Sequence, residues 1–304
     1  MKVAFFGTSA FAVPSLERLA ARQQVTLCVT QPDKPQGRGL KPEPSPVKVA
    51  AQRLSVPLRQ LARLDRAVVE ESGATLGVVV AYGTLIPREV LAVLRHGMLG
   101  VHPSLLPKYR GAAPVAWAIL NGETMTGVTI FRLNERLDAG EILIQEPVRI
   151  EPDEDAHALT ERLARLGADA LVRAVDMLET GRAVFRPQDD AAATMAPKLA
   201  KAQGRVDWTA PAETLARLVR ALAPWPGAST TWQGRDMKLW AASAAAGPAA
   251  APGTVVSVGP EAVVVATGQG TLAIRALQPA GRRRMTVQEF LAGHEVRVGD
   301  HLGT

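Results

Sequence analysis

The sequence predicts an α/β fold in which an open, doubly wound, mostly parallel sheet is followed by a small C-terminal β-barrel of OB type. Over the first 150 residues, short apolar segments alternate with amphipathic ones, and this alternation is typical of strands and helices around a parallel sheet. Beyond residue 250, short β-type segments are separated by Gly and Pro turns, as in small barrels. The length of 304 residues fits two domains.

The N-terminal part is expected to alternate strands and helices. Buried strands are predicted at residues 2–7, 25–30, 76–83 and 99–102, because these are short, continuous apolar segments. Helices are predicted at residues 14–23 and 88–97, a hairpin at 128–133 and 141–150, and a long helix at 153–181. We therefore assign residues 1–188 to a first domain.

The helical periodicity is lost at residues 189–205, which we interpret as a linker. A helix is then predicted at residues 211–223, and strands at 253–259, 262–267 and 271–278. The Ala-rich segment 241–253 has low complexity and is expected to be a loop. Residues 206–304 form the second predicted domain.

The composition excludes several classes of protein. Cys28 is the only cysteine, so no internal disulfide forms, and no Cys/His cluster suggests a metal site. No apolar segment reaches the ~18–20 residues that span a membrane, and the N-terminal apolar segment is too short for a signal peptide. We therefore expect a cytoplasmic protein that binds neither a membrane nor a metal.

The positive charge is concentrated near the C-terminus. Residues 191–304 hold 12 Lys and Arg and 7 Asp and Glu, which gives +5 of the formal net charge of +6. A basic C-terminal third indicates an anionic partner, such as a nucleic acid, or a solvated basic surface.

His102 is the candidate for proton chemistry. It ends a predicted strand and is followed by the stiff turn Pro103–Pro107, which would fix nearby groups as catalysis requires. Asp138 lies in a loop after the next strand, where it is placed to act as the partner of a His proton carrier. A structural His and an Asp that only caps a turn remain the alternatives. A serine-hydrolase interpretation through Ser104 is disfavoured, because the G-x-S-x-G elbow is missing.

A proline-rich basic loop follows the second predicted strand, at residues 31–48. Open α/β sheets bind ligands at the carboxyl ends of their strands, and long loops without secondary structure are often functional. Its side chains Lys34, Arg38 and Lys41 are suited to phosphate groups.

Several stretches resemble the methionyl-tRNA formyltransferase family, over essentially the whole chain. They are FFGTSAFAVPSL, QPDKPQGRGLKPEPSPVK, VVVAYGTLIP, VHPSLLPKYRGAAPVAWAILNGETMTGVTIFRL, LDAG, GRVDW, APWPGA and LQPAGRRRM. The resemblance implies a Rossmann-like formyltransferase domain with the folate and catalytic sites, a linker, and an OB-like domain that binds tRNA.

The resemblance also implies the reaction. The formyl group of 10-formyltetrahydrofolate is transferred to the α-amino group of methionine on initiator methionyl-tRNA, for translation initiation. The amine attacks the formyl carbon directly, His102 stabilises the oxyanion, and Asp138 orients His102 and manages the proton. We expect a monomer that needs no metal.

Binding residues carry over from the resemblance by position. Those for the formyl donor are Ser104, Leu105, Leu106, Pro107, Tyr82 and Gly83. Those for tRNA are Phe11, Lys34, Arg38, Lys41, Arg282, Arg283 and Arg284.

One catalytic position departs from the family. The family pattern is Asn-x-His, with the Asn helping to hold the formyl group, and here Gly100 takes that position. Because Gly has no side chain to donate a hydrogen bond, we expect a bridging water in a small polar gap. On that hypothesis Gly100→Asn keeps or raises turnover.

Two other functions remain open from the sequence. One is a folate-dependent formyltransferase that acts on another amine, such as that of a sugar nucleotide or of glycinamide ribonucleotide. The other is a tRNA-binding paralogue whose catalysis is impaired by Gly100.

Overall fold

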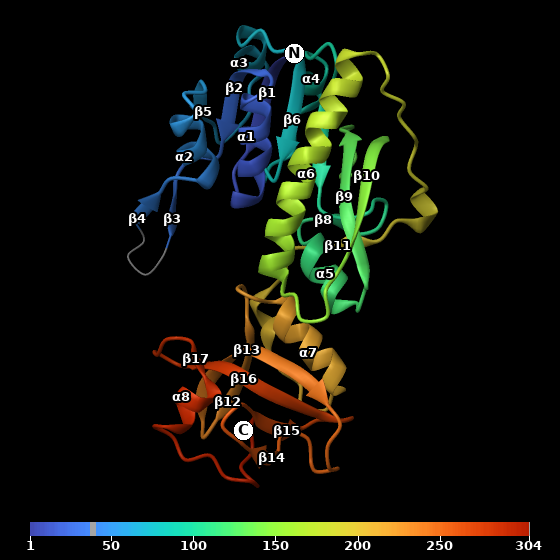
Figure 1. Ribbon diagram of the computed structural model, residues 1–304. Helices are drawn as coiled ribbons and strands as arrows, with labels where there is room; N and C mark the ends of the chain where they lie inside the picture. Colours follow the sequence, from blue (N-terminus) through green and yellow to red (C-terminus); the bar gives the residue numbers. More distant parts are fainter. Residues whose placement is uncertain (37–40, 304) are drawn as a thin grey trace. The chain divides into compact units, whose positions relative to one another are not determined.

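The structure, a computed structural model, describes residues 1–36 and 41–303. It divides into two compact units, each with a sheet of its own (Figure 1). The first unit contains residues 1–114, 125–149 and 160–196, and the second contains residues 115–124, 150–159 and 197–304.

The first unit is built on a seven-stranded sheet with the order β10-β9-β7-β6-β1-β2-β5. Its strands are β1 (Lys2–Gly7), β2 (Gln24–Thr30), β5 (Leu58–Gln60), β6 (Leu76–Val80), β7 (Met98–His102), β9 (Met125–Arg132) and β10 (Ile142–Arg149). The strands from β7 to β5 are parallel, and β9 and β10 add an antiparallel hairpin at the β7 edge. The predicted mostly parallel sheet is confirmed.

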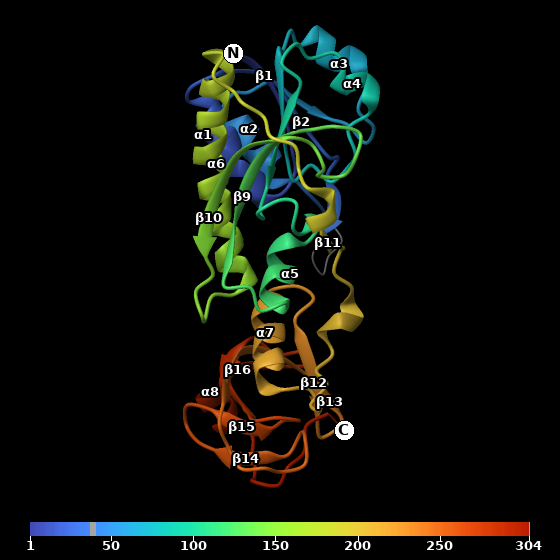
Figure 2. The ribbon, with the colours of Figure 1, turned by 90° about the vertical axis from the view of Figure 1, so that its right-hand side faces the viewer.

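Helices cover both faces of this sheet (Figure 2). One face carries α1 (Val13–Ala20), α2 (Pro46–Arg53) and α6 (Ala156–Glu179), and the other carries α3 (Arg66–Glu71) and α4 (Arg88–Leu91). On the α3/α4 face, Phe6 belongs to the same buried cluster as Val69 and Val90. On the α6 face, Gly167 approaches Val101 so closely that a Cβ there would lie 2.8 Å from the Val101 Cγ1. The core therefore holds β7 firmly behind His102.

Shorter elements join the loops of the first unit. The hairpin β3 (Lys34–Gln36) and β4 (Lys41–Glu43) and the parallel pair β8 (Arg110–Gly111) and β11 (Met195–Ala196) are two-stranded sheets. Residues 189–205 contain three short elements: η2 (Asp190–Ala192), β11 and η3 (Lys201–Gly204). The other 3-10 helix is η1 (Ala10–Ala12).

The second unit contains an antiparallel sheet of six strands. They are β12 (Ala228–Trp232), β13 (Arg235–Ala245), β14 (Val255–Val258), β15 (Val263–Ala266), β16 (Thr271–Pro279) and β17 (Met285–Thr286); the helices are α5 (Pro114–Leu120), α7 (Ala212–Ala221) and α8 (Val287–Leu291). Trp208, Leu239 and Ile274 lie in its apolar core.

Two local predictions were wrong. The predicted loop 241–253 begins as a strand, because residues 241–245 pair with β16 and this pairing satisfies their backbone. The predicted helix 88–97 ends early, with α4 stopping at Leu91. No helix in the described part of the chain is long and apolar enough to cross a membrane.

Candidate active site

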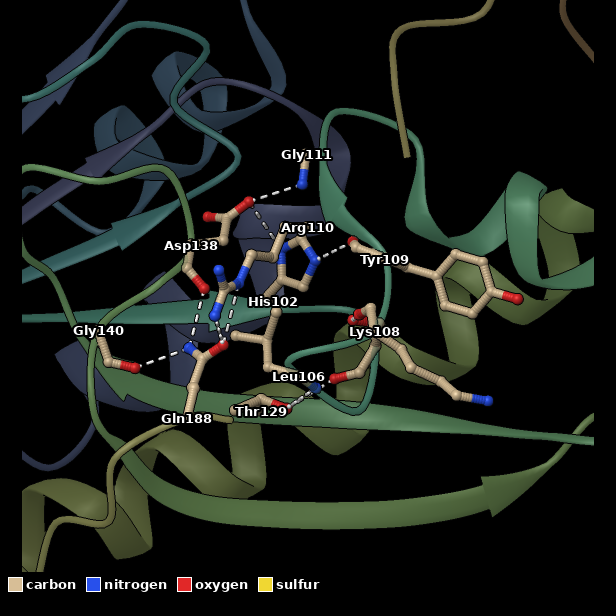
Figure 3. A network of polar contacts seen from close by, with 11 residues as sticks. His102, Leu106, Lys108, Tyr109, Arg110, Gly111, Thr129, Asp138, Gly140 and Gln188 are labelled. Atoms are coloured by element: carbon tan, nitrogen blue, oxygen red, sulfur yellow. Dashed lines mark hydrogen bonds and ion pairs between the residues drawn. The ribbon is translucent and has the colours of Figure 1, made fainter. Parts of the chain in front are cut away.

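His102 ends β7 and is 6% exposed. Its Nε2 lies 2.8 Å from the carbonyl oxygen of Tyr109, and its Nδ1 lies 3.7 Å from the Oδ2 of Asp138 (Figure 3). Because a carbonyl only accepts hydrogen bonds, Nε2 carries a proton and donates a hydrogen bond to the Tyr109 carbonyl oxygen. Nδ1 is therefore the ring nitrogen that faces Asp138.

The two residues that flank the imidazole have left-handed backbones. Tyr109 has φ of 61° and Asp138 has φ of 49°, conformations that cost about 1–3 kcal/mol for residues other than Gly. Both are held from outside: the Thr194 Oγ1 accepts from the Tyr109 amide at 2.9 Å, and the Asp138 Oδ2 accepts from the Gly111 amide at 2.8 Å. The surrounding chain thus fixes both partners of His102.

The turn after His102 is fixed by the neighbouring hairpin. The Thr129 hydroxyl donates to the Ser104 carbonyl at 2.7 Å and accepts from the Leu106 amide at 3.1 Å. The side-chain amide of Gln145 donates through its Nε2 to the Leu106 carbonyl at 2.8 Å. Thr129 pairs with His102 across β7 and β9, so the hairpin of β9 and β10 places both the end of β7 and the turn that follows it.

A second network of hydrogen bonds, through Arg110 and Gln188, joins the turn after His102 to the Asp138 loop (Figure 3). The buried Arg110 guanidinium donates to the Gln188 Oε1 at 3.1 and 2.7 Å and to Asp190 at 2.8 Å. Gln188 in turn donates to the carbonyls of Asp138 and Gly140. Arg136 and Arg110 hold the pKa of the Asp190 carboxyl below its usual range.

These features suit acyl transfer to a nucleophile without a metal ligand set. A rigid imidazole with a carboxylate beside it can stabilise an oxyanion and move a proton. In the described residues, no cluster of three or more His, Cys, Asp and Glu side chains could hold a metal ion.

Comparison with known proteins identifies the family. Residues 1–175 match the formyl transferase family model, and residues 198–295 match that of the formyl transferase C-terminal domain. Curated methionyl-tRNA formyltransferases of Thermus thermophilus, Solibacter usitatus and Geobacter metallireducens are 46%, 44% and 42% identical to the chain; each alignment covers 100% of this chain and 99% of the relative. The chain belongs to the methionyl-tRNA formyltransferase family.

Solved structures share the fold of this family. HypX from Aquifex aeolicus in complex with tetrahydrofolic acid matches with a TM-score of 0.65 and 20% identity, over 99% of this chain and 51% of that one. WlaRD, a sugar 3N-formyl transferase, matches with a TM-score of 0.69 and 15% identity, over 93% and 99% of the two chains. At these identities the likeness establishes the fold alone.

The position of the family Asn is filled by another side chain. A Cβ on Gly100 would lie 2.5 Å from the Phe131 Cε1 and 2.8 Å from the Leu133 Cδ1. Phe131 pairs with Gly100 across β7 and β9, is 4% exposed, and clusters with Leu106 and Ile142. The expected polar gap with a bridging water is therefore wrong, because an apolar ring already occupies the space.

The residues predicted to bind the formyl donor lie at the carboxyl ends of β6 and β7. Tyr82 and Gly83 follow β6, and Ser104–Pro107 follows β7. Burial raises the pKa of the Tyr82 hydroxyl. The Ser104 hydroxyl donates to the Lys108 carbonyl at 2.6 Å and the residue is fully buried, so Ser104 holds the shape of the turn and presents no reactive hydroxyl.

The residues predicted to bind tRNA are divided between the units. Phe11 lies in η1 of the first unit and is 9% exposed. Lys34 and Lys41 lie in β3 and β4, whereas Arg38 lies outside the described residues. Arg282, Arg283 and Arg284 belong to the second unit and are exposed.

Several site residues escaped the sequence analysis. Gln145 and Gln188 lie outside the motifs that they support, and Thr129 stands in the same quoted motif as His102 but 27 residues further along. Arg110 and Phe131 stand inside quoted motifs, but their roles depend on contacts across strands. The local signal was a polar Thr129 between the apolar residues Val128 and Ile130 of a predicted strand, because a buried polar group needs a partner.

Proposed function

We propose that this enzyme transfers the formyl group of 10-formyltetrahydrofolate to the α-amino group of methionine on initiator methionyl-tRNA. The observation that carries the proposal is the His102–Asp138 pair, fixed at the carboxyl edge of the sheet. It stands in a chain that is 40–46% identical to methionyl-tRNA formyltransferases over nearly its whole length. The product serves translation initiation.

The chemistry is a direct acyl transfer. The amine nitrogen bonds to the formyl carbon, and the carbonyl oxygen becomes an oxyanion. The bond from that carbon to N10 of the folate then breaks, and the proton lost by the amine ends on N10. No covalent bond to the enzyme forms.

His102 acts on the oxyanion through Nδ1. Its Nε2 is committed to the Tyr109 carbonyl, so Nδ1 is the ring nitrogen left to act on the oxyanion. The Asp138 carboxylate beside Nδ1 orients the ring. The carboxylate also accepts the proton that the amine loses and passes it to N10.

The formyl donor binds at the ends of β6 and β7. Tyr82, Gly83 and the Ser104–Pro107 turn form its side of the site. Leu105, which is partly exposed, supplies apolar surface for the ring systems of a folate, and Leu106 belongs to the buried cluster with Phe131 and Ile142 that supports the turn.

The tRNA contacts both halves of the chain. We assign residues 1–188 to the folate and catalytic domain, 189–205 to a linker, and 206–304 to an OB-type barrel for tRNA. Phe11 and the loop Lys34–Lys41 meet the acceptor arm, and Arg282–Arg284 meet the backbone. The Arg284 guanidinium lies 5.3 Å from the Trp240 ring, so the second unit offers an aromatic face beside the cations, as single-stranded segments favour. The enzyme works as a cytoplasmic monomer.

The decisive experiment offers the enzyme two amines with 10-formyltetrahydrofolate. Charged initiator tRNA is expected to be formylated, and an amino-sugar nucleotide or glycinamide ribonucleotide is not. Formylation of a small amine alone would assign the chain another substrate, and binding of tRNA without transfer would make it an inactive paralogue. Mass spectrometry of the released aminoacyl group reads out the product.

The tRNA contacts are tested by their dependence on salt. Because Lys and Arg contacts release counterions from phosphates, the KM for charged tRNA should rise steeply with ionic strength while the KM for the formyl donor does not. Arg38→Ala, and the combined change of Arg282–Arg284 to Ala, should raise the KM for tRNA alone. Arg297→Ala, an exposed Arg of the second unit that pairs with Glu295, is the matched control.

A further inference from the structure

The chain that follows α6 returns to the active site as a strap, residues 186–196. One end of the strap pairs with the chain beside the Asp138 loop, and the other end pairs with the chain beside the turn that follows His102. Arg186 exchanges backbone hydrogen bonds with Ile142 at 2.7 and 2.8 Å, and β11 pairs with β8 next to the His102 turn. The strap was predicted only as the end of one domain and the start of a linker.

We infer that Gln188, in the middle of this strap, is a positioning residue for Asp138. The inference rests on the proposed function and adds a residue to its machinery. The Gln188 Nε2 donates to the Asp138 carbonyl at 2.9 Å and to the Gly140 carbonyl at 2.7 Å. Its Oε1 accepts twice from Arg110.

The Gln188 amide fits this place in one orientation only. Two carbonyls face its nitrogen and a guanidinium faces its oxygen, so a reversed amide would set an acceptor against two acceptors and donors against donors. Neither Glu nor an apolar residue reproduces both halves. The side chain therefore recognises both loops at once.

The Asp138 loop needs such support. The left-handed backbone of Asp138 persists only when its surroundings over-determine it. The loop is also tight at Gly140, where a Cβ would lie 1.6 Å from the Arg132 carbonyl oxygen. Gln188 binds the carbonyls on both sides of this bend, so its loss frees the carboxylate that faces the His102 Nδ1.

Arg110 carries the same support to the other loop. Its side chain is 7% exposed, and a buried guanidinium is stable only when its donors are paired. Gln188 and Asp190 supply the acceptors. Arg110 also lies between Tyr109 and Gly111, whose backbone groups bond His102 and Asp138. Gln188 thus fixes the position of the Asp138 loop relative to the Tyr109–Gly111 segment, and these two segments flank the imidazole.

The test is a kinetic comparison of Gln188 variants in the full-length enzyme. Gln188→Ala should lower kcat about 10–100-fold, because a displacement of about 1 Å of a reacting group costs that much. The KM for the formyl donor should change less than about 3-fold, since the interaction lost acts on the transition state. Gln52→Ala, an exposed glutamine of the same unit on α2, should leave both constants unchanged.

Two further variants separate positioning from general stability. Gln188→Glu keeps the acceptor for Arg110 but sets a carboxylate oxygen against the two carbonyls, so it should fold and still lose kcat. In an Asp138→Asn background, Gln188→Ala should cost less than about 2-fold, because residues that act as a unit are not additive.

A full second loss in the Asp138→Asn background, or normal kcat in Gln188→Glu, would overturn the inference. If the unmodified enzyme transfers no formyl group, the proposed function fails instead. The two failures are therefore distinguishable in one set of assays.

Discussion

The two sides of His102 differ in kind. On the Asp138 side, the site is polar, and a carboxylate, two carbonyls and a backbone amide are joined by hydrogen bonds. On the Gly100 side, the site is apolar, and Phe131 and Leu133 fill the space that a longer side chain at position 100 would need. Both sides are built from β7 and β9 and the loops that follow them.

The difference between the Asp138 side and the Gly100 side indicates which groups can stabilise charge during formyl transfer. A group that stabilises charge must be fixed and must have donors or a carboxylate at hand. The Asp138 side has both, whereas the Gly100 side is filled by the apolar side chains of Phe131 and Leu133. We therefore propose that His102 and Asp138 carry the reaction, with no contribution from a side chain at position 100.

Removing the imidazole should have the largest effect. His102→Ala is expected to lower kcat about 10²–10³-fold, the usual cost of one oxyanion donor. Binding of the formyl donor should change little, since Tyr82 and the Ser104–Pro107 turn remain. Steady-state kinetics and donor titration by fluorescence measure the two quantities. Turnover close to normal would remove His102 from the mechanism.

Asp138→Asn should be nearly as severe as the loss of His102. The amide keeps the size of the carboxylate but cannot accept the proton that leaves the amine. The two single losses should not multiply in the double variant, because the groups act together. Fully multiplicative losses in single-turnover rates would show that the two side chains act independently.

Gly100→Asn is expected to harm the enzyme, in contrast to the expectation from sequence. The new side chain overlaps Phe131, and overpacking a core costs about 1–3 kcal/mol of stability. Adding Phe131→Ala should relieve the overlap, so the double variant should be more stable than the sum of the single effects. Thermal unfolding and kcat are the measurements, with Gly293→Asn as a control, because nothing lies within 4 Å of a Cβ at Gly293. A single variant as stable and active as the unmodified enzyme would contradict the packing argument.

Asp190→Asn should have the smallest effect on the Asp138 side. The carboxylate is half exposed, and exposed ion pairs contribute little, so kcat should fall about 1–5-fold. Arg136 and Arg110 lower its pKa in the folded state. Its contribution is therefore present above the pKa of an unfolded Asp and is lost as the pH falls through the lower folded value. Between pH 5 and 8 the pH–rate profile should keep its shape, and a new transition in that range would contradict this assignment.

The sequence predicted the elements that depend on local pattern. The parallel strands ending at Gly7, Thr30 and His102 are continuous apolar segments, and the structure contains them. The loop predicted at 241–253 failed because pairing of β13 with β16 outweighed the weak β preference of alanine.

The candidate site divides in the same way. His102 and Asp138 could be selected because each stands at a strand end or loop tip that the pattern reveals. Gln188 and Phe131 could not, because their roles arise from contacts with residues 50 and 31 positions away. The hypothesis of a water at Gly100 failed for that reason: the sequence shows the missing Asn but not the ring that replaces it.

The most direct test is the rate of formyl transfer from 10-formyltetrahydrofolate to charged initiator methionyl-tRNA by the unmodified enzyme. It should be run beside the Gly100→Asn/Phe131→Ala variant. We expect measurable transfer by the unmodified enzyme and no gain from the restored Asn. An inactive unmodified enzyme, with transfer only in the variant that carries Asn at position 100, would contradict the proposed roles of His102 and Asp138.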